Sequence, residues 1–323
     1  MTIDLVCVGA CYLDTILTVP HYPDEDEKLR ATNLQVRRGG NCPNTLEVLQ
    51  QLLRGKQEAS ACARIKPYIL TCLPSRNAST TASIIASYGT NALVDFSTTI
   101  FRDDLQEPAS CYVLRSEATG TRTSVNFNQM PDMTFEEFVS ATKNLGDTGW
   151  FHFEGRTPVI TLQCIRWLRQ SKPKARVSVE IEKPGREGLE ELAADADVVF
   201  YSRSWAESKL YESAEQCLRA QVAVARKARL LFCTWGSQGA SCLSLPAGNL
   251  KSCPPGRILR VVDTVGAGDT FIAGVLFCLC YDQIWSDQAI LGFAVELASS
   301  KIQQEGFGGL GYKELRRLEV APS

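Results

Sequence analysis

Residues 263–271 read "DTVGAGDTF" and join a strand-like apolar run, 258–262, to a helix-like run, 271–277. A turn that leads into a capped helix needs only one glycine and one capping side chain. This stretch has two glycines and an alanine over 266–268, followed by an aspartate, Asp269, in the first turn of the expected helix. The additional small residues indicate that a molecule outside the chain approaches the backbone closely here.

If Gly266, Ala267 and Gly268 form the turn and Asp269 opens the helix, several free backbone N–H groups point at one spot. The helix dipole adds positive potential there, so the stretch predicts a site for a bulky anion such as a phosphate. A hydroxyl that attacks a phosphorus must lose its proton, and Asp269 stands where it could accept that proton. The motif therefore predicts phosphoryl transfer to an alcohol. A capped helix after a glycine turn is the structural alternative.

Two other phosphate-binding motifs are absent. The sequence contains no G-x-x-x-x-G-K-[ST] run, which a Walker A loop requires. A dinucleotide-binding turn needs a third glycine after G-x-G, whereas Gly268 is followed by Asp269, Thr270 and Phe271.

The composition limits the class of protein. The chain has 323 residues, 45% hydrophobic and 22% charged, which fits a soluble protein with one large domain or one large and one small domain. A net charge of −2 predicts no nucleic-acid partner, and no apolar run reaches the roughly 18–20 residues of a membrane helix. The thirteen cysteines are odd in number and form no C-x-x-C, and the start of the chain lacks signal-peptide features. We therefore expect reduced thiols and a cytoplasmic protein.

Short apolar runs alternate with helix-length segments along most of the chain. The expected strands are 4–9, 68–72, 92–96, 150–153, 176–181, 198–201, 230–234 and 258–262. The expected helices are 45–53, 78–88, 135–145, 160–170, 214–227, 270–279 and 286–303. Continuous apolar strands that alternate with helices are typical of a mainly parallel sheet covered on both faces, so we expect an α/β fold.

Four further segments alternate apolar and polar residues. They are 13–20, 28–37, 110–117 and 122–128, and the last two flank the hairpin signal "ATGT". Such strands predict a small half-exposed sheet that projects from the main body like a lid. The apolar face of this sheet needs a partner, either the substrate or a second copy of the chain.

A second glycine-rich stretch, "RRGGNCPNT", covers residues 37–45. It places Asn41 and Asn44 one turn apart at the start of a helix, where their amides could bind sugar-like hydroxyls. An asparagine cap after a glycine turn is the alternative. Asp14, after the first strand, and Asp26, in an acidic loop, would add acceptors for hydroxyl groups.

These motifs resemble those of the ribokinase-like sugar kinases, which carry an early G-G-x-x-x-N run and a late D-T-x-G-A-G-D run. Here the early run spans 39–44, with the glycine pair displaced by one residue, and the late run spans 263–269. Within that family the chain is most similar to the ketohexokinase group. The stretches that carry this similarity are "LVCVGACYLD" at 5–14, "YPDEDEKLR" at 22–30, "HFEGR" at 152–156, "VSVEIEKP" at 177–184 and "EGFGG" at 305–309.

The resemblance implies a ribokinase-like three-layer fold with a β-sheet lid, forming one kinase domain over 1–323, with lid strands from about 14–37 and 110–128. It implies a sugar kinase in which Asp269 is the catalytic base and Gly266, Ala267 and Gly268 hold the transferring phosphate. Arg122 would reach from the lid to the nucleotide phosphates, a task that suits its planar fork of donors.

For the sugar, the resemblance implies hydrogen bonds from Asp14, Asp26, Gly40, Asn41 and Asn44. The acceptor would be a ketohexose such as fructose, phosphorylated at O1.

The nucleotide site would be lined by Gly236, Ser237, Gln238 and Gly239. ATP and Mg²⁺ are the implied cofactors, a requirement for K⁺ stays open, and pairing of lids would give a homodimer.

Two features depart from the family pattern. The N-x-x-E motif near the magnesium waters is absent from 201–206, and Glu180 or Glu182 would serve the metal through water. The segment 55–80 lacks the usual glycine-containing turn, which could distort the site. A kinase of another polyol, a sugar acid or a nucleoside, and an inactive sugar or nucleotide sensor, are the alternative functions.

Overall fold

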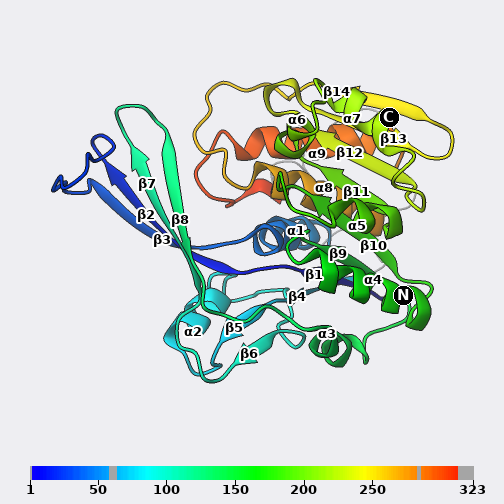
Figure 1. Ribbon diagram of the computed structural model, residues 1–323, viewed down its shortest axis with the longest axis horizontal. Helices are drawn as coiled ribbons and strands as arrows, with labels where there is room; N and C mark the ends of the chain where they lie inside the picture. Colours follow the sequence, from blue (N-terminus) through cyan, green and yellow to red (C-terminus); the bar gives the residue numbers. More distant parts are fainter. Residues whose placement is uncertain (1, 58–63, 282–284, 312–323) are drawn as a thin grey trace.

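The computed structural model describes residues 2–57, 64–281 and 285–311, and it has the expected ribokinase-like α/β architecture (Figure 1). The order of the main sheet is β14-β13-β12-β11-β10-β9-β1-β4. Its parallel strands are β1 (Thr2–Val8), β4 (Arg64–Leu70), β9 (Gly149–Phe153), β10 (Arg176–Ile181), β11 (Val198–Tyr201) and β12 (Leu230–Thr234). Two antiparallel strands, β13 (Ala240–Ser244) and β14 (Asn249–Cys253), extend the sheet beyond β12.

Helices cover both faces of this sheet. One layer holds α1 (Asn41–Gln57), α8 (Ala267–Tyr281) and α9 (Asp287–Lys301). The other holds α3 (Phe135–Thr142), α4 (Pro158–Ser171), α5 (Leu189–Asp195), α6 (Arg203–Ser208) and α7 (Ala214–Gln221). Side chains of β1 alternate between the two cores, with Leu5 and Cys7 in the first and Val6 and Val8 in the second. A strand buried on both faces therefore reads as a continuous apolar run.

The lid is a separate four-stranded sheet in the order β3-β2-β7-β8, projecting to the left of the body in Figure 1. Its strands are β2 (Tyr12–Val19), β3 (Asn33–Gly39), β7 (Ala109–Ser116) and β8 (Arg122–Phe127). All four expected lid strands are thus present. The ends of β2, β7 and β8 lie within one residue of the expected ends, whereas β3 starts at Asn33 instead of residue 28 and ends at Gly39 instead of residue 37.

Two expected strands are wrong. Within 92–96 only Asp95 pairs, in an isolated bridge to Tyr68, and 258–262 forms no strand. Leu259 is 78% exposed and Val261 56%, so this apolar run lies on the surface rather than in the sheet. An apolar run of five residues does not by itself distinguish a buried strand from an extended surface segment.

The unusual segment 55–80 keeps the central sheet intact, as far as it is described. β4 pairs with β1 in parallel from Arg64 to Leu70, and the chain continues into β5 (Cys72–Pro74), which pairs with β6 (Ile100–Arg102). The short helix α2 (Ser79–Ala86) follows. Residues 58–63 lie outside the described part of the chain.

Twelve cysteines are free, and the thirteenth, Cys62, lies outside the described residues. In the part of the chain that was searched, no helix combines the length and the apolar character needed to cross a bilayer.

Candidate functional site

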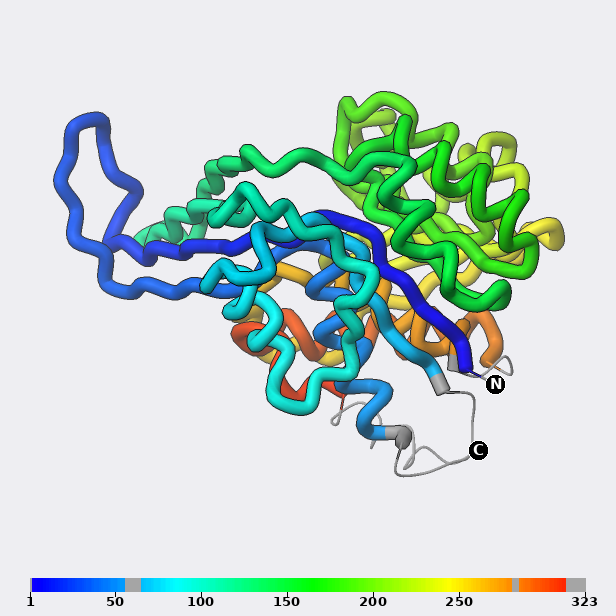
Figure 2. Tube along the Cα trace, turned by 90° about the horizontal axis from the view of Figure 1, so that it is seen from below, coloured from blue at the N-terminus to red at the C-terminus, as the bar shows by residue number. Residues whose placement is uncertain are grey.

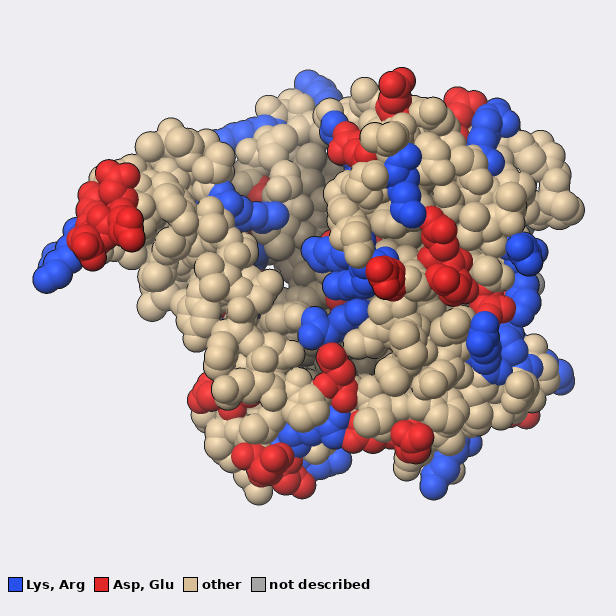
Figure 3. Space-filling model, viewed as in Figure 1, with Lys and Arg blue, Asp and Glu red and all other residues tan. Residues whose placement is uncertain are grey.

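A cleft of about 1320 Å³ lies between the lid and the main body. Figure 3 shows this hollow, with lysine and arginine side chains gathered along its rim. Its floor comes from the carboxyl ends of β10, β11 and β12 and from the segment 261–269, and its outer wall comes from the inner face of the lid. Ligands of open α/β sheets bind at the carboxyl ends of the strands, so this position is a natural binding site.

The loop 263–269, called here the anion loop, enters α8 along one wall of the cleft. Gly266 has a φ of +78°, and a Cβ at this position would lie 2.4 Å from the ring of Phe307. Both the backbone conformation and the close ring therefore require glycine. At Gly268 no heavy atom comes within 4 Å of an added Cβ, so that position is open.

Asp269 lies in the first turn of α8 at the bottom of the cleft and is 9% exposed. Its Oδ2 accepts a hydrogen bond of 2.8 Å from Nδ2 of Asn44, and its carbonyl accepts one of 3.2 Å from the Thr45 hydroxyl. Burial raises the pKa of Asp269 well above its ordinary value of 3.8, and the nearby Glu180 adds to this effect, against the hydrogen bond from Asn44. A carboxyl group with a raised pKa in a cleft is suited to proton transfer.

Three glutamates lie near Asp269: Glu180 and Glu182 line the cleft, and Glu154 lies outside its lining. Burial, reinforced by Glu180, raises the pKa of Glu154 to about 7, and burial, reinforced by Glu182, raises that of Glu180 to about 8. Because the folded protein holds these protons more tightly than the unfolded chain does, their contribution to stability is largest at low pH. It is lost as the pH rises through about 7 to 8.

Glu180 is held by a chain of buried hydrogen bonds. The indole Nε1 of Trp150 donates to Oγ of Ser178 at 2.8 Å, and this hydroxyl lies 2.9 Å from Nδ1 of His152. Because this hydroxyl accepts from Trp150, its own O–H donates a hydrogen bond to Nδ1 of His152. Nε2 therefore carries the ring proton and donates a hydrogen bond to Oε1 of Glu180 at 3.1 Å. Burial lowers the pKa of His152 to about 3, so the ring is neutral. Asn41 donates to the other oxygen of Glu180 at 2.7 Å.

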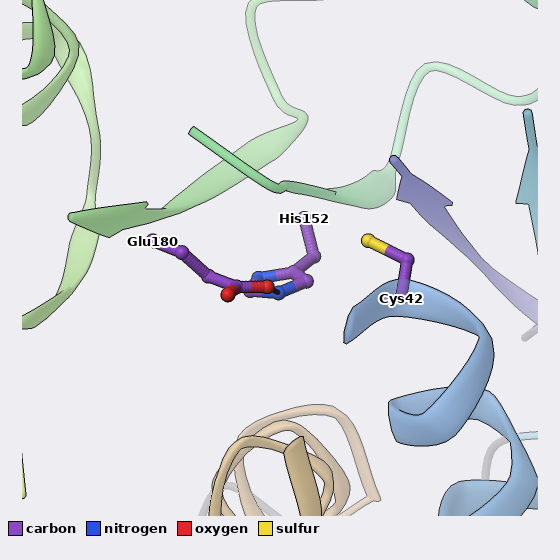
Figure 4. Close-up of side chains that lie close together, drawn as sticks. All are labelled: Cys42, His152 and Glu180. Carbon is purple, nitrogen blue, oxygen red and sulfur yellow. Dashed lines mark hydrogen bonds and ion pairs between the residues drawn. The ribbon is translucent and has the colours of Figure 1, made fainter. Parts of the chain in front are cut away.

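Cys42, His152 and Glu180 point toward one another from α1, β9 and β10 (Figure 4). One ligand atom of each lies within 4.8 Å of the others, which is compatible with a metal ion. However, both ring nitrogens of His152 already have hydrogen-bond partners. The cluster therefore orients Glu180 toward the cleft.

The sugar-side residues meet around the base of the lid. Asp14, Gly40, Asn41 and Asn44 all line the cleft. A Cβ on Gly39 would lie 2.4 Å from the Asp14 carboxylate, and one on Gly40 would lie 2.2 Å from a backbone carbonyl, so the glycine pair lets the two elements pack closely. Burial raises the pKa of Asp14, against nearby arginines.

Asp26 is not brought to the cleft of its own chain. It is exposed and belongs to the connection between β2 and β3, residues 20–32, which extends away from the main body at the far end of the lid (Figure 2). Its φ of +63° fits a tight turn, and its carboxylate is solvated there. A sugar-binding role for Asp26 within one chain finds no support in this arrangement.

The expected nucleotide residues lie beside the cleft rather than on its lining. Gly236, Ser237 and Gln238 form a 3-10 turn directly after β12, whose Thr234 does line the cleft. A Cβ on Gly239 would lie 2.0 Å from the carbonyl oxygen of Cys253. Gly239 is therefore required by the β13–β14 hairpin, and a nucleotide role for these four residues stays a prediction.

Arg122 faces the cleft from β8, and its cross-strand neighbour Arg115 faces it from β7. The sequence reading singled out neither Arg115 nor Arg37, which also lines the cleft. It also missed Lys301, whose ammonium pairs with Asp263. Arg37 pairs across strands with Asp14, and Arg115 pairs with Arg122, so the pairing of the lid strands could have indicated both. No local pattern marks Lys301.

Comparison with known proteins agrees with this geometry. The family model "pfkB family carbohydrate kinase" matches residues 2–310. Ketohexokinase of Mus musculus is 33% identical over 313 residues, covering 95% of this chain and 98% of that protein. Among solved structures, Arabidopsis thaliana ribokinase complexed with ribose and ATP superposes with a TM-score of 0.77 at 18% identity, covering 99% of this chain and 100% of that one.

A nucleoside kinase of Methanocaldococcus jannaschii has a TM-score of 0.71 at 17% identity, covering 98% of each chain. At such low identity the two structures show a shared fold. The family model and the mouse relative each span nearly the whole chain. This protein therefore belongs to the pfkB family of carbohydrate kinases.

Proposed function

We propose that this carbohydrate kinase transfers the γ-phosphate of ATP to a hydroxyl of a neutral sugar, with a ketohexose such as fructose at O1 as the acceptor. The observation that carries the proposal is the placement of Asp269, a buried carboxylate with a raised pKa in the first turn of α8, next to Gly268, which lines the cleft and is open. The mouse relative is a ketohexokinase, which supports the choice of acceptor.

In this reaction Asp269 takes the proton from the attacking hydroxyl, while the backbone N–H groups of 266–268 hold the transferring phosphate. Asn44 fixes the orientation of the base through its 2.8 Å hydrogen bond. The carboxylate of Asp14 and the amide oxygen of Asn41 accept hydrogen bonds from sugar hydroxyls at the base of the lid, while the amide nitrogen of Asn41 donates to Glu180 and Glu182. Arg122 holds the phosphates from the lid, which closes the cleft against water.

The floor of the cleft fits a magnesium ion. Glu180 and Glu182 offer hard carboxylate oxygens. Glu180 is hydrogen-bonded by Asn41 and by the neutral His152, and neither partner carries a charge. Mg²⁺ prefers oxygen ligands and keeps several waters, so these glutamates would hold it through water. When bound, the ion neutralises charge on the transferring phosphates. A requirement for K⁺ stays a prediction.

The proposal is tested by ADP release over a panel of acceptors: fructose, ribose, adenosine, a 2-keto-3-deoxy sugar acid and fructose 1-phosphate. Fructose should give the highest kcat/KM. Asp14→Asn should lower that value by about 10- to 100-fold, the usual worth of a hydrogen bond to a charged group. Asp103→Asn, in an exposed turn, is the matched control.

If the sugar acid or the phosphorylated sugar gives the highest kcat/KM, then Arg37, Arg115 and Arg122 dominate recognition of the acceptor. The proposal of a neutral acceptor would then be wrong. The highest kcat/KM for adenosine would favour a nucleoside kinase. If nothing releases ADP while nucleotide still binds, the chain is a sensor.

Arg122→Ala should raise the KM for ATP and lower kcat, each by about tenfold, because a phosphate clamp acts in both the ground and the transition state. Arg226→Ala, at an exposed turn position after α7, is the control and should leave both constants unchanged. Steady-state kinetics at varied ATP measure the effect. Unchanged constants in the Arg122 variant would make it an ordinary surface residue.

The outer face of the lid predicts a homodimer. Its apolar side chains are exposed, from 50% to 63%: Leu34, Val36, Tyr112, Val125 and Phe127. An apolar sheet face of this kind is covered in solution, and a twofold pairing of lids is the simplest cover. Such pairing also places the exposed connection that carries Asp26 next to a partner.

Light scattering should therefore give a dimer at micromolar concentration, and Val125→Glu should give a monomer with reduced activity. Val159→Glu, at a position 73% exposed on α4, is the matched control and should remain dimeric. A wild-type monomer with full activity would contradict the expected pairing.

A further inference from the structure

A lysine is buried directly behind the anion loop. Lys301 is the last residue of α9, and its side chain is 0% exposed. Its Nζ donates to the carbonyl oxygen of Asp263 at 3.0 Å and to Oδ2 of the same residue at 3.1 Å. Lysine is almost never fully buried without a partner, because removing its charge from water is costly. The cost is offset here by two contacts to the first residue of the anion loop.

The same part of the chain holds the anion loop at further points. The carbonyl of Ile302 accepts hydrogen bonds from the N–H groups of Val262, at 2.7 Å, and Asp263, at 3.2 Å. The ring of Phe307 packs against Gly266, and Nζ of Lys301 lies 5.2 Å from the centre of that ring. The anion loop therefore packs against residues 301–307. Among these contacts, the one made by the Lys301 ammonium carries a charge.

The ion pair between Lys301 and Asp263 also affects the electrostatic potential at the anion loop. Within the loop, Oδ1 of Asp263 accepts from the N–H of Val265 at 2.9 Å, so the carboxylate is part of the loop's own structure. Burial works to raise the pKa of Asp263, but the Val265 N–H and the Lys301 ammonium outweigh it and hold that pKa below the ordinary value. Without a cation behind it, this carboxylate would repel a phosphate at the loop.

We propose that Lys301 is a positioning residue for phosphoryl transfer: its buried ammonium neutralises Asp263 and fixes the base of the anion loop, whose residues Gly266–Gly268 line the cleft. This inference rests on the proposed function for its kinetic consequence, but not for its effect on anion binding. Nη1 of Arg37 lies 3.5 Å from the same Oδ2 of Asp263 and adds a second and more exposed cation.

The chain offers a matched control. Lys172 is also buried, at 4% exposure, but its Nζ donates to the carbonyl of Leu145 at 2.6 Å and lies 4.0 Å from Asp147, both far from the anion loop in sequence and outside the lining of the cleft. A purely structural role would make Lys301→Met and Lys172→Met equivalent: each would lower the melting temperature and leave the kinetic constants of the folded enzyme unchanged. If Lys301 has a positioning role, only Lys301→Met should also change the kinetic constants of the folded enzyme.

The experiment measures binding of inorganic tripolyphosphate by calorimetry, and kcat and KM for the sugar, in both variants. Lys301→Met should weaken tripolyphosphate binding and lower kcat by about 10- to 100-fold each, the usual effect of losing a charge-assisted contact. The KM for the sugar should stay near its wild-type value, and Lys172→Met should match the wild type in all three quantities. Equal behaviour of the two variants would overturn the inference.

A second measurement covers the case in which Lys301→Met fails to fold. Lys301→Ala leaves a cavity of the shape of the lost side chain, which methylammonium can enter and tetramethylammonium cannot. Methylammonium should restore at least part of the tripolyphosphate affinity, and tetramethylammonium should not. Equal effects of the two ions would refute a specific role for the buried ammonium.

Wild-type protein that binds tripolyphosphate but phosphorylates no sugar would refute the proposed function alone. The binding comparison would still test Lys301.

Discussion

The Asp269→Asn variant should bind ATP nearly as well as the wild-type protein and turn over about 10²- to 10⁴-fold more slowly, the usual contribution of a positioned general base. The substitution keeps the shape of the side chain and its contact with Asn44, but it removes the lone pair that takes the proton. The loss should therefore appear in kcat rather than in the affinity for either substrate. Single-turnover measurements with saturating ATP and sugar separate the chemical step from product release.

The pH dependence gives an independent test of the same residue. Burial and Glu180 raise the pKa of Asp269, so in the free enzyme a larger share of this carboxyl is protonated near neutral pH than for an ordinary aspartate. The base works only when deprotonated, so kcat/KM should rise with pH through the raised pKa, and this rise should be absent from the residual activity of Asp269→Asn.

Asp147→Asn, on an exposed side chain, is the control and should keep the wild-type profile. Turnover of Asp269→Asn within about threefold of wild type would remove the residue from the mechanism.

The sequence could predict the main sheet because burial on both faces makes its strands continuously apolar. The runs at 150–153, 198–201 and 230–234 are strands in the structure for this reason. The run at 258–262 is apolar apart from Arg260, yet it lies on the surface, because the edge of the sheet beyond β12 is covered by the β13–β14 hairpin instead. Those two strands are short and partly polar, so no continuous apolar run marks them.

The candidate site could be predicted only where a local motif carries it. The motifs around Asn44 and Asp269 were each visible, but their hydrogen bond joins residues 225 positions apart and follows from the packing of α1 against α8. The chain from Trp150 through His152 to Glu180 crosses neighbouring strands, so it depends on register that sequence spacing does not show. Lys301, the last residue of α9, and Phe307, beyond that helix, touch the anion loop from a distant part of the sequence. Asp26 has no local signal that distinguishes a site residue from a solvated turn.

The second large effect is expected at Gly266. An alanine there must adopt a φ near +78°, which costs about 1–2 kcal/mol for an L-residue, and its Cβ would lie 2.4 Å from the Phe307 ring. The loop can relieve both only by turning its N–H groups away from their present direction. Gly266→Ala should therefore lower kcat/KM by about 10- to 100-fold, since each 1.4 kcal/mol corresponds to a factor of ten. It should also lower the melting temperature by about 2–4 °C for each kcal/mol lost.

Gly268→Ala is the internal control, because an added Cβ meets no atom within 4 Å and the backbone there is not left-handed. Its melting temperature should equal that of the wild type, and any loss should appear only as weaker nucleotide binding, because the Cβ would enter the space left for the phosphate. Phe307→Leu in the Gly266→Ala background should recover part of the lost stability by making room for the Cβ, while the cost of the positive φ remains. If Gly266→Ala has wild-type stability and kinetics, the loop geometry is not what binds the transferring group. Asp269 would then act beside an anion site built from other residues, with the lid arginines as the next candidates.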